Sequence, residues 1–188
     1  MAWNLGLLGG AAGGVAGAYN HLETTVLATA ASSVTFSGLA SYASDGYKHL
    51  QIRASTRSAT TGSANQGYIT FNGDTTVANY SRHSYQSTGV TDVPKNWGSG
   101  WPQVTLNSAT GYDSNGFSVS VIDIINPFDS NQNTIVKSTN GMIQPTNLFY
   151  ISNYMGAWLN TASVTSLTVF ENNQNQDAKT RFSLYGWK

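Results

Sequence analysis

The chain has 188 residues, of which 10% are charged, and its nine basic residues balance its nine acidic ones. This length suits one domain with an appendage, since domains typically run about 100 to 200 residues. A net charge of zero gives no long-range field to attract nucleic acid or an acidic membrane, and the absence of cysteine excludes disulfides, zinc–thiolate sites and thiol nucleophiles.

Residues 1–18 form a Gly/Ala-rich apolar segment. Its six glycines each cost a helix about 1 kcal/mol relative to alanine. No basic residue precedes the apolar run, which argues against a signal peptide, and the run is shorter than the roughly 20 residues that span a bilayer. We therefore predict an extended attachment arm, followed by a single domain over 19–188. The hydrophobic residues by which the arm would bind a partner are Trp3, Leu5, Leu7, Leu8 and Val15.

From residue 22 onward, short β-rich runs alternate with turn residues. In residues 49–55, Leu50, Ile52 and Ala54 alternate with polar residues, which is typical of a strand with one buried face. No convincing amphipathic helix interrupts the series, so we predict an all-β fold, an antiparallel β-sandwich or jelly roll. The expected strands are 22–28, 33–36, 49–55, 67–71, 80–85, 104–106, 117–125, 134–137, 147–152, 164–170 and 181–185.

Two segments between the expected strands stand out. Asn72-Gly73 is a common signal for a tight hairpin turn, because both residues tolerate positive φ. Residues 88–100 collect a proline, glycines and the aromatic Trp97, with Trp101 directly after, which indicates an irregular loop. Large aromatic side chains in a loop either cover a core or contact a partner.

The chain fails the tests for common cofactor and metal motifs. Gly9 and Gly14 have phosphate-loop spacing, but Val15 occupies the position of the required lysine. Residues 129–133 supply oxygens like a calcium loop, yet Thr134 and Asn140 replace the glycine and glutamate such a loop needs, so an Asn-rich turn is the simpler interpretation. His21, His49 and His83 lie far apart in the sequence, without metal-ligand spacing. We predict no metal and no cofactor.

No set of catalytic residues can be recognised either. The chain has no G-x-S-x-G sequence, and only two glutamates for the carboxylate pair of a glycosidase. Asp123 interrupts the most apolar expected strand, which favours a buried ion pair with Arg53 or Arg82 over a catalytic acid. Trp97, Trp101, Trp158 and Trp187 could stack on a sugar, although sandwich cores and interfaces also need large rings. We predict that the protein is not an enzyme.

Several segments in order resemble a widespread group of small structural proteins of tailed bacteriophages. These segments are Val34-Thr35-Phe36, residues 47–53 (YKHLQIR), Phe71-Asn72-Gly73-Asp74 with Asn79-Tyr80, Val121-Ile122-Asp123-Ile124, residues 158–162 (WLNTA), Val164-Thr165-Ser166-Leu167 and residues 182–186 (FSLYG). The resemblance rests on order and spacing over roughly 20–188, because each piece alone is ordinary strand and turn chemistry.

This resemblance implies a location in the virion and a role as a capsid decoration (cement) protein or as part of a tail appendage. The first hypothesis is a homotrimer on the outer surface of the capsid, with the arm lying across the major capsid protein. The alternative is a tail-fibre or receptor-binding module, in which the segment with Trp97 and Trp101 contacts a host glycan. A polysaccharide-degrading enzyme is the third hypothesis.

Overall fold

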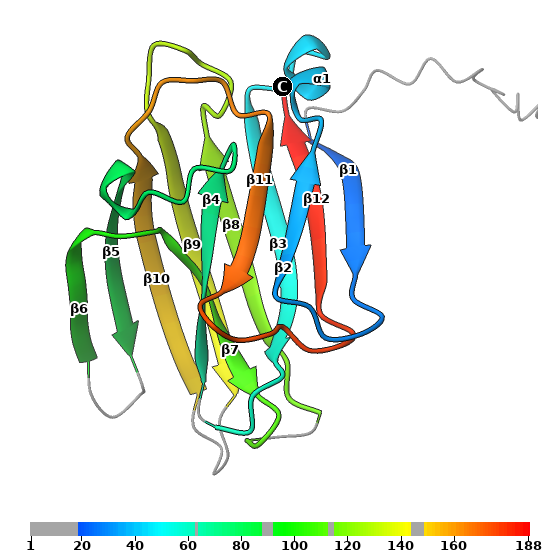
Figure 1. The fold of residues 1–188 in the computed structure, drawn as a ribbon, viewed down its shortest axis with the longest axis vertical. Helices are drawn as coiled ribbons and strands as arrows, with labels where there is room; N and C mark the ends of the chain where they lie inside the picture. Colours follow the sequence, from blue (N-terminus) through cyan, green and yellow to red (C-terminus); the bar gives the residue numbers. More distant parts are fainter. Residues whose placement is uncertain (1–18, 63, 88–91, 113–114, 144–148) are drawn as a thin grey trace, which may run out of the picture.

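The computed structural model describes residues 19–188 apart from 63, 88–91, 113–114 and 144–148, and for 92–97 it describes the backbone alone (Figure 1). Twelve strands, one short α-helix and one 3₁₀ turn make up this part of the chain. They are β1 (Tyr19–Val26), β2 (Ser33–Ser37), α1 (Ala40–Ser44), β3 (His49–Ser58), β4 (Asn65–Phe71), η1 (Val77–Asn79), β5 (Tyr80–Ser87), β6 (Asp92–Ser99), β7 (Gln103–Ala109), β8 (Ser118–Ile125), β9 (Thr134–Ile143), β10 (Phe149–Trp158), β11 (Ser166–Glu171) and β12 (Arg181–Trp187).

The strands form two layers, which confirms the predicted all-β sandwich. The long sheet has the antiparallel order β1-β12-β3-β8-β9-β10-β5-β6, and the short sheet has the order β2-β11-β4-β7. The sheets join at one corner, where the ends of β3 and β7 pair in parallel through Arg57 and Ser108. Figure 1 shows β2, β11 and β4 in front of the long sheet, with β5 and β6 extending past them.

The core lies between the two sheets, as the alternating pattern requires. Leu50, Ile52 and Ala54 of β3 point inward, as predicted, and pack in one cluster with Ile122 of β8 and Phe36 of β2. Burying a large apolar side chain stabilises a fold by about 1.5 to 3 kcal/mol. Apolar contacts between the two sheets are therefore the main interactions that stabilise the sandwich.

The Asn72-Gly73 turn is present, but the strands that it joins do not pair with each other. Asn72 has a φ of 52° and Gly73 a φ of 70°, and the Asp74 N–H donates to the Phe71 carbonyl over 2.8 Å. However, β4 belongs to the short sheet and β5 to the long one. The turn was predicted correctly, and the expected hairpin was wrong because β4 finds its partners in the distant strands β7 and β11.

Each expected strand has a counterpart, and β6 is the strand that the sequence analysis missed. The prediction of an irregular loop over 88–100 is wrong for Asp92–Ser99, which pairs with β5. The register of this pair shifts between His83 and Ser84, which accommodates one extra residue in β6. Because β6 is an edge strand, it tolerates Pro94, which lacks the N–H that an inner strand must donate.

Candidate interaction surface

The outer face of the long sheet, which is turned away from the short sheet, carries large exposed hydrophobic side chains. Val119 and Phe149 are 60% exposed, and Ile151 is 59% exposed. Together with other side chains of β8, β9 and β10 they form what we call the outer patch. Its members are Val119, Val121, Ile135, Ile143, Phe149, Ile151 and Met155.

Strand register explains why these side chains share one face. Val119 lies opposite Gly141, and Gly141 lies opposite Ile151, so the three residues form a row across β8, β9 and β10. Phe149 pairs with Ile143 two residues further along. Side chains in a strand alternate between faces, so these residues point outward while their neighbours Ser120, Asn140 and Ser152 are buried.

Val119, Phe149 and Ile151 are the most exposed side chains of the outer patch, and we call this end of it the ridge. Beside it, a hollow of about 560 Å³ lies over Gly141 and is lined by Val119, Val121 and Ile151. Because Gly141 has no side chain, the surface is lower there than at Val119 and Ile151 on either side. The ridge therefore offers apolar side chains on both sides of a shallow depression.

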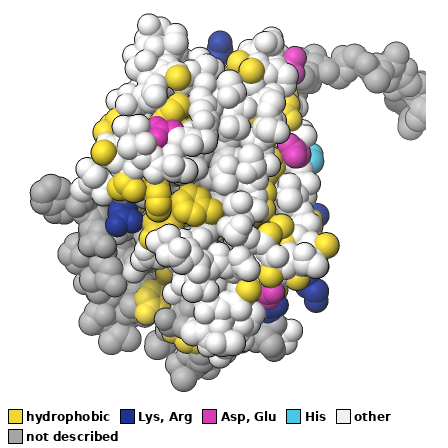
Figure 2. Space-filling model, in the orientation of Figure 1, with side chains coloured by type: hydrophobic (Ala, Val, Ile, Leu, Met, Phe, Trp, Pro, Cys, Tyr) yellow, Lys and Arg dark blue, Asp and Glu magenta, His cyan; other side chains and the backbone are white. Residues whose placement is uncertain are grey.

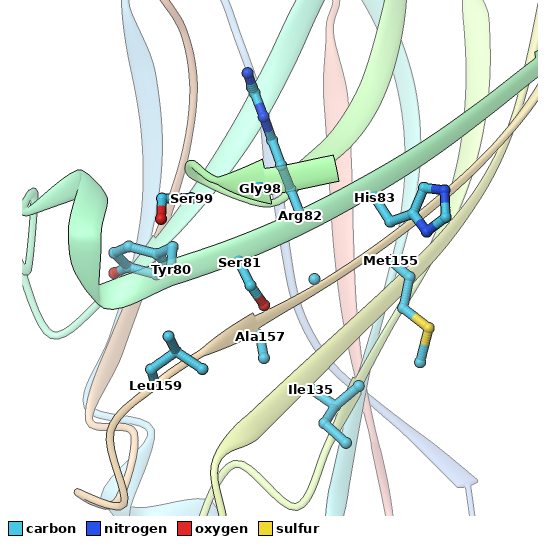
Figure 3. Close-up of a pocket in the computed structure, with 11 residues that line it drawn as sticks. Tyr80, Ser81, Arg82, His83, Gly98, Ser99, Ile135, Met155, Ala157 and Leu159 are labelled. Atoms are coloured by element: carbon cyan, nitrogen blue, oxygen red, sulfur yellow. The ribbon is translucent and has the colours of Figure 1, made fainter. Parts of the chain in front are cut away.

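A second hollow of about 570 Å³ lies toward the other end of the same strands (Figure 3). Its lining includes the small residues Ala157, Ser81 and Gly98, while Ile135 and Met155 stand around it as larger side chains. Figure 3 shows Ile135, Met155 and Ala157 near one another, with Arg82 extending away from them. Small side chains between larger ones leave space for an apolar group of a binding partner.

The outer patch carries balanced charge. Asp123 of β8 lies opposite Lys137 of β9 in the register, between the two hollows. These two charges cancel at distance, and Arg53, which also lines the first hollow, adds one positive charge at the border of the patch. Because the surface has few charged groups, removing it from water costs less than removing an ordinary charged protein surface.

An aromatic cluster borders the outer patch at the β1 edge of the long sheet. Tyr19 stacks on Tyr185 with ring centroids 4.9 Å apart, and Trp187 meets Tyr19 edge-on at 5.7 Å. The Arg53 guanidinium lies over both tyrosine rings, at 5.6 and 5.5 Å. Burial raises the pKa of the Tyr19 phenol, whose hydroxyl donates to Gln51 over 2.7 Å. The cluster is an ordered, partly exposed surface of rings and hydrogen-bonding groups.

Asp123 belongs to this polar network and not to a buried ion pair, so that prediction is wrong. It is half-buried on the outer face and accepts a hydrogen bond from Gln51 Nε2 over 2.7 Å. Arg53 donates to Gln51, and Arg82 lies over the Tyr68 ring on the other side of the sheet. Strand β8 is apolar on both faces because its outward residues belong to the exposed patch. The sequence therefore did not indicate which face of the strand the other sheet covers.

The buried carboxylate of the fold is Glu171, which the sequence analysis did not single out. It is 3% exposed and accepts hydrogen bonds of 2.6 Å from Ser58 Oγ and from Asn107 Nδ2. Thr56 and Asn65 complete this buried cluster through Asn107 and Ser58. Burial raises the pKa of Glu171. Each of its oxygens is engaged inside the fold, so the group stabilises the junction of β3, β4, β7 and β11 and is closed to substrate.

The histidines and the Asn-rich turn make local contacts. His21 hydrogen-bonds Thr24, and the Nδ1 of the half-buried His49 accepts the Asn126 N–H over 3.2 Å. Asp129 accepts the Asn131 N–H over 2.9 Å, as an Asn-rich turn would. Within the described ranges, no group of three or more His, Cys, Asp or Glu side chains is arranged to hold a metal ion.

The predicted contact residues fall in two places. The arm residues Trp3, Leu5, Leu7, Leu8 and Val15 lie outside the described residues, as does the side chain of Trp97. Trp101 is half-buried and packs edge-on against Phe170 and Tyr68, with ring centroids 5.2 and 6.2 Å away. Trp101 therefore covers other aromatic residues of the fold. Figure 2 shows that hydrophobic side chains also gather on the short-sheet side of the molecule.

In the part of the chain that is described, no helix has the length and apolar character needed to cross a membrane. Comparisons with models of known protein families, with curated proteins and with solved structures found no match.

Proposed function

We propose that this protein is a non-enzymatic structural component of a tailed-phage particle, namely a capsid decoration protein on the outer surface of the head. The observation that carries the proposal is the outer patch, an apolar sheet face with balanced charge. Exposed apolar patches larger than a few hundred Å² mark interaction sites on soluble proteins. A weakly charged face with several exposed apolar side chains is suited to packing in an assembly.

The order of the strands supports the proposal. We infer a jelly roll, because two groups of four strands, β1-β12-β3-β8 and β2-β11-β4-β7, face each other. Along the chain these eight strands change group at every step except between β4 and β7, which both belong to the second group. The remaining strands β9, β10, β5 and β6 extend the first group. Jelly rolls are common in viral capsid proteins and in lectins, so the fold is compatible with the decoration hypothesis without proving it.

The predicted arm supplies the contact with the major capsid protein. Burial of Trp3, Leu5, Leu7 and Leu8 would contribute about 1.5 to 3 kcal/mol each before ordering costs. In the proposed homotrimer three arms act together, which raises the overall affinity through effective concentration. The sandwich would then stand on the head surface as a separately folded knob.

Deletion of residues 1–18 is the experiment that tests this role of the arm. The shortened protein should keep the melting temperature and circular dichroism of the full chain, because residues 34–184 of the described part of the chain already form a closely packed core cluster. It should lose at least about 100-fold in affinity for heads that lack the protein, measured by cosedimentation, since several anchor side chains are removed together. A full chain carrying Val77→Lys, an exposed change in η1, is the control. Undiminished binding of the shortened protein would refute the arm as the attachment.

A second candidate function, glycan binding in a tail appendage, is favoured by the aromatic cluster and not by Trp101. Tyr19 and Trp187 are partly exposed and border a hollow of about 290 Å³ with Gln51 and Arg53. Aromatic rings beside hydrogen-bonding side chains can stack on a sugar and orient it. If this function is the real one, a glycan-array signal should appear and fall at least about tenfold in Trp187→Ala, but not in Val77→Lys. The absence of any signal for the full chain would exclude this candidate.

A further inference from the structure

We propose that the outer patch is the surface by which one copy of this chain binds another, with the ridge of one copy seated in the second hollow of the next. This inference rests on the proposed function, since it names a contact between copies of the proposed decoration protein; the contact is reciprocal, so it joins copies in pairs and is separate from the contacts of the homotrimer. The partner is a second copy of the chain, as the area, charge and shape of this face indicate.

The outer face of the long sheet, which contains the outer patch, is large enough for self-association. Strands lie about 4.8 Å apart and rise about 3.3 Å per residue, so the ten-residue strands β9 and β10, with β8 and β5 beside them, present about 600 Å². A standard interface buries about 800 Å² on each partner. Adding the outer faces of β3, β12 and β1 brings the available area to about 1,100 Å². The whole face therefore reaches the size that a stable contact needs.

The charges on the patch fit a second copy better than a charged partner. A strongly acidic or basic partner would need a patch with several charges of opposite sign, whereas Asp123 and Lys137 balance each other and Arg53 adds a single positive charge at the border. Two copies of such a surface do not repel each other at long range. The central pair can also exchange partners across the contact, with Asp123 of one copy meeting Lys137 of the other, so that neither charge is buried alone.

The shape of the patch is self-complementary. The most exposed side chains, Phe149, Ile151 and Val119, lie at one end, and the second hollow with small residues such as Ala157 and Ser81 lies toward the other. Ile151 and Ala157 are six residues apart on β10, about 20 Å. With a ridge and a hollow on one surface, the ridge of each copy can occupy the hollow of the other. Identical subunits related by a two-fold axis meet in this reciprocal way.

Light scattering of the full chain over a range of concentrations, with Ile151→Lys as the test variant, measures this contact. We expect the wild type to have the mass of two or more 20.1 kDa chains. Ile151→Lys should raise the dissociation constant by at least about tenfold, because the interface would have to bury an unpaired charge. Val77→Lys adds the same charge at an exposed position on η1 and should keep the wild-type mass. Circular dichroism confirms that each variant is folded.

Cysteine cross-linking tests the seating of the ridge in the hollow. The natural chain has no cysteine, so a variant with both Ile151→Cys and Ala157→Cys has only the introduced thiols. These two positions are too far apart to link within one chain, since a disulfide needs Cα atoms within about 7 Å. Mild oxidation should therefore give covalent multimers of this variant and only traces with Val77→Cys.

The proposal is overturned if the wild type is a single chain at about 100 µM, where a contact of the standard class is well populated. It is also overturned if Ile151→Lys keeps the wild-type mass, or if the cysteine variant forms no more multimer than Val77→Cys. These results are separate from head binding. A single chain that still binds heads contradicts only this inference, whereas an Ile151-dependent oligomer that does not bind heads contradicts only the decoration role.

Discussion

Replacing Trp158 with alanine should lower the free energy of unfolding by about 3 to 5 kcal/mol, the usual cost of truncating a buried tryptophan. Trp158 is 2% exposed and lies 5.8 Å from the Phe71 ring, between centroids, where the end of β10 meets the short sheet. Its Nε1 donates to the Asp74 Oδ2 over 2.8 Å. Domains are stable by only about 5 to 15 kcal/mol, so this change should remove a large fraction of the total.

Trp158→Phe separates ring packing from the hydrogen bond. Phenylalanine keeps much of the buried volume but cannot donate to Asp74, so we expect a loss of about 1 to 2 kcal/mol. Asp74 would still accept from Asn79 and from the Thr76 N–H. Urea denaturation followed by circular dichroism, at one protein concentration for all variants, measures the three free energies. Equal losses for phenylalanine and alanine would contradict the claim that packing is the larger contribution.

Replacing Glu171 with alanine is the second change with a large expected effect, about 2 to 4 kcal/mol. The substitution would leave the Ser58 hydroxyl and the Asn107 amide without the carboxylate that accepts their hydrogen bonds. A buried polar group that loses its partner costs about 1 to 3 kcal/mol. Glu171→Gln retains an acceptor for Asn107 and should cost less than alanine in the same denaturation experiment. Equal costs would show that the hydrogen bonds of this cluster contribute little.

Glu171 should also make stability depend on pH. Burial raises its folded-state pKa above the ordinary value of 4.5, so the folded protein favours the neutral carboxyl. Its contribution to stability is fully present below that ordinary value and is lost as the pH rises through the folded-state pKa. The difference in unfolding free energy between the wild type and Glu171→Gln should therefore shift against the wild type as pH increases. A difference that does not change with pH would contradict this assignment.

Sequence alone predicted the local features of the fold well. The alternation in residues 49–55 identified the buried face of β3, and the positive φ values of Asn72 and Gly73 follow from their residue types. Pairing between distant strands was beyond the sequence, because β4 pairs with β7 and β11 and no local signal specifies those partners. The missed strand β6 contains Pro94 and Gly98, which weaken a strand signal and are tolerated at a sheet edge.

The candidate surface was harder to predict for a related reason. Val119 and Val121 alternate with residues of β8 that face the core, and a strand that is apolar on both sides does not indicate which side another layer covers. Asp123 was accordingly placed in the interior, although it lies on the outer face. Glu171 is one of only two glutamates in the sequence and ends an alternating strand, which is a weak signal for a special role. Its burial could not be predicted, because its hydrogen-bond partners Ser58 and Asn107 lie on other strands.

The arm and the outer patch have different proposed roles in the assembly. The arm would provide attachment to the capsid shell, and the outer patch would join copies to each other. Because the anchors of the arm and the residues of the outer patch are different, variants such as Ile151→Lys and the arm deletion should affect different measurements. This independence allows each part of the proposal to fail alone.

Locating and counting this protein on purified phage particles tests the central claim most directly. Cryo-electron microscopy, with quantitative mass spectrometry of the same particles, would give its position and its copy number. The decoration role predicts many copies distributed over the outer surface of the head. A few copies confined to the tail, or none in the particle, would contradict it.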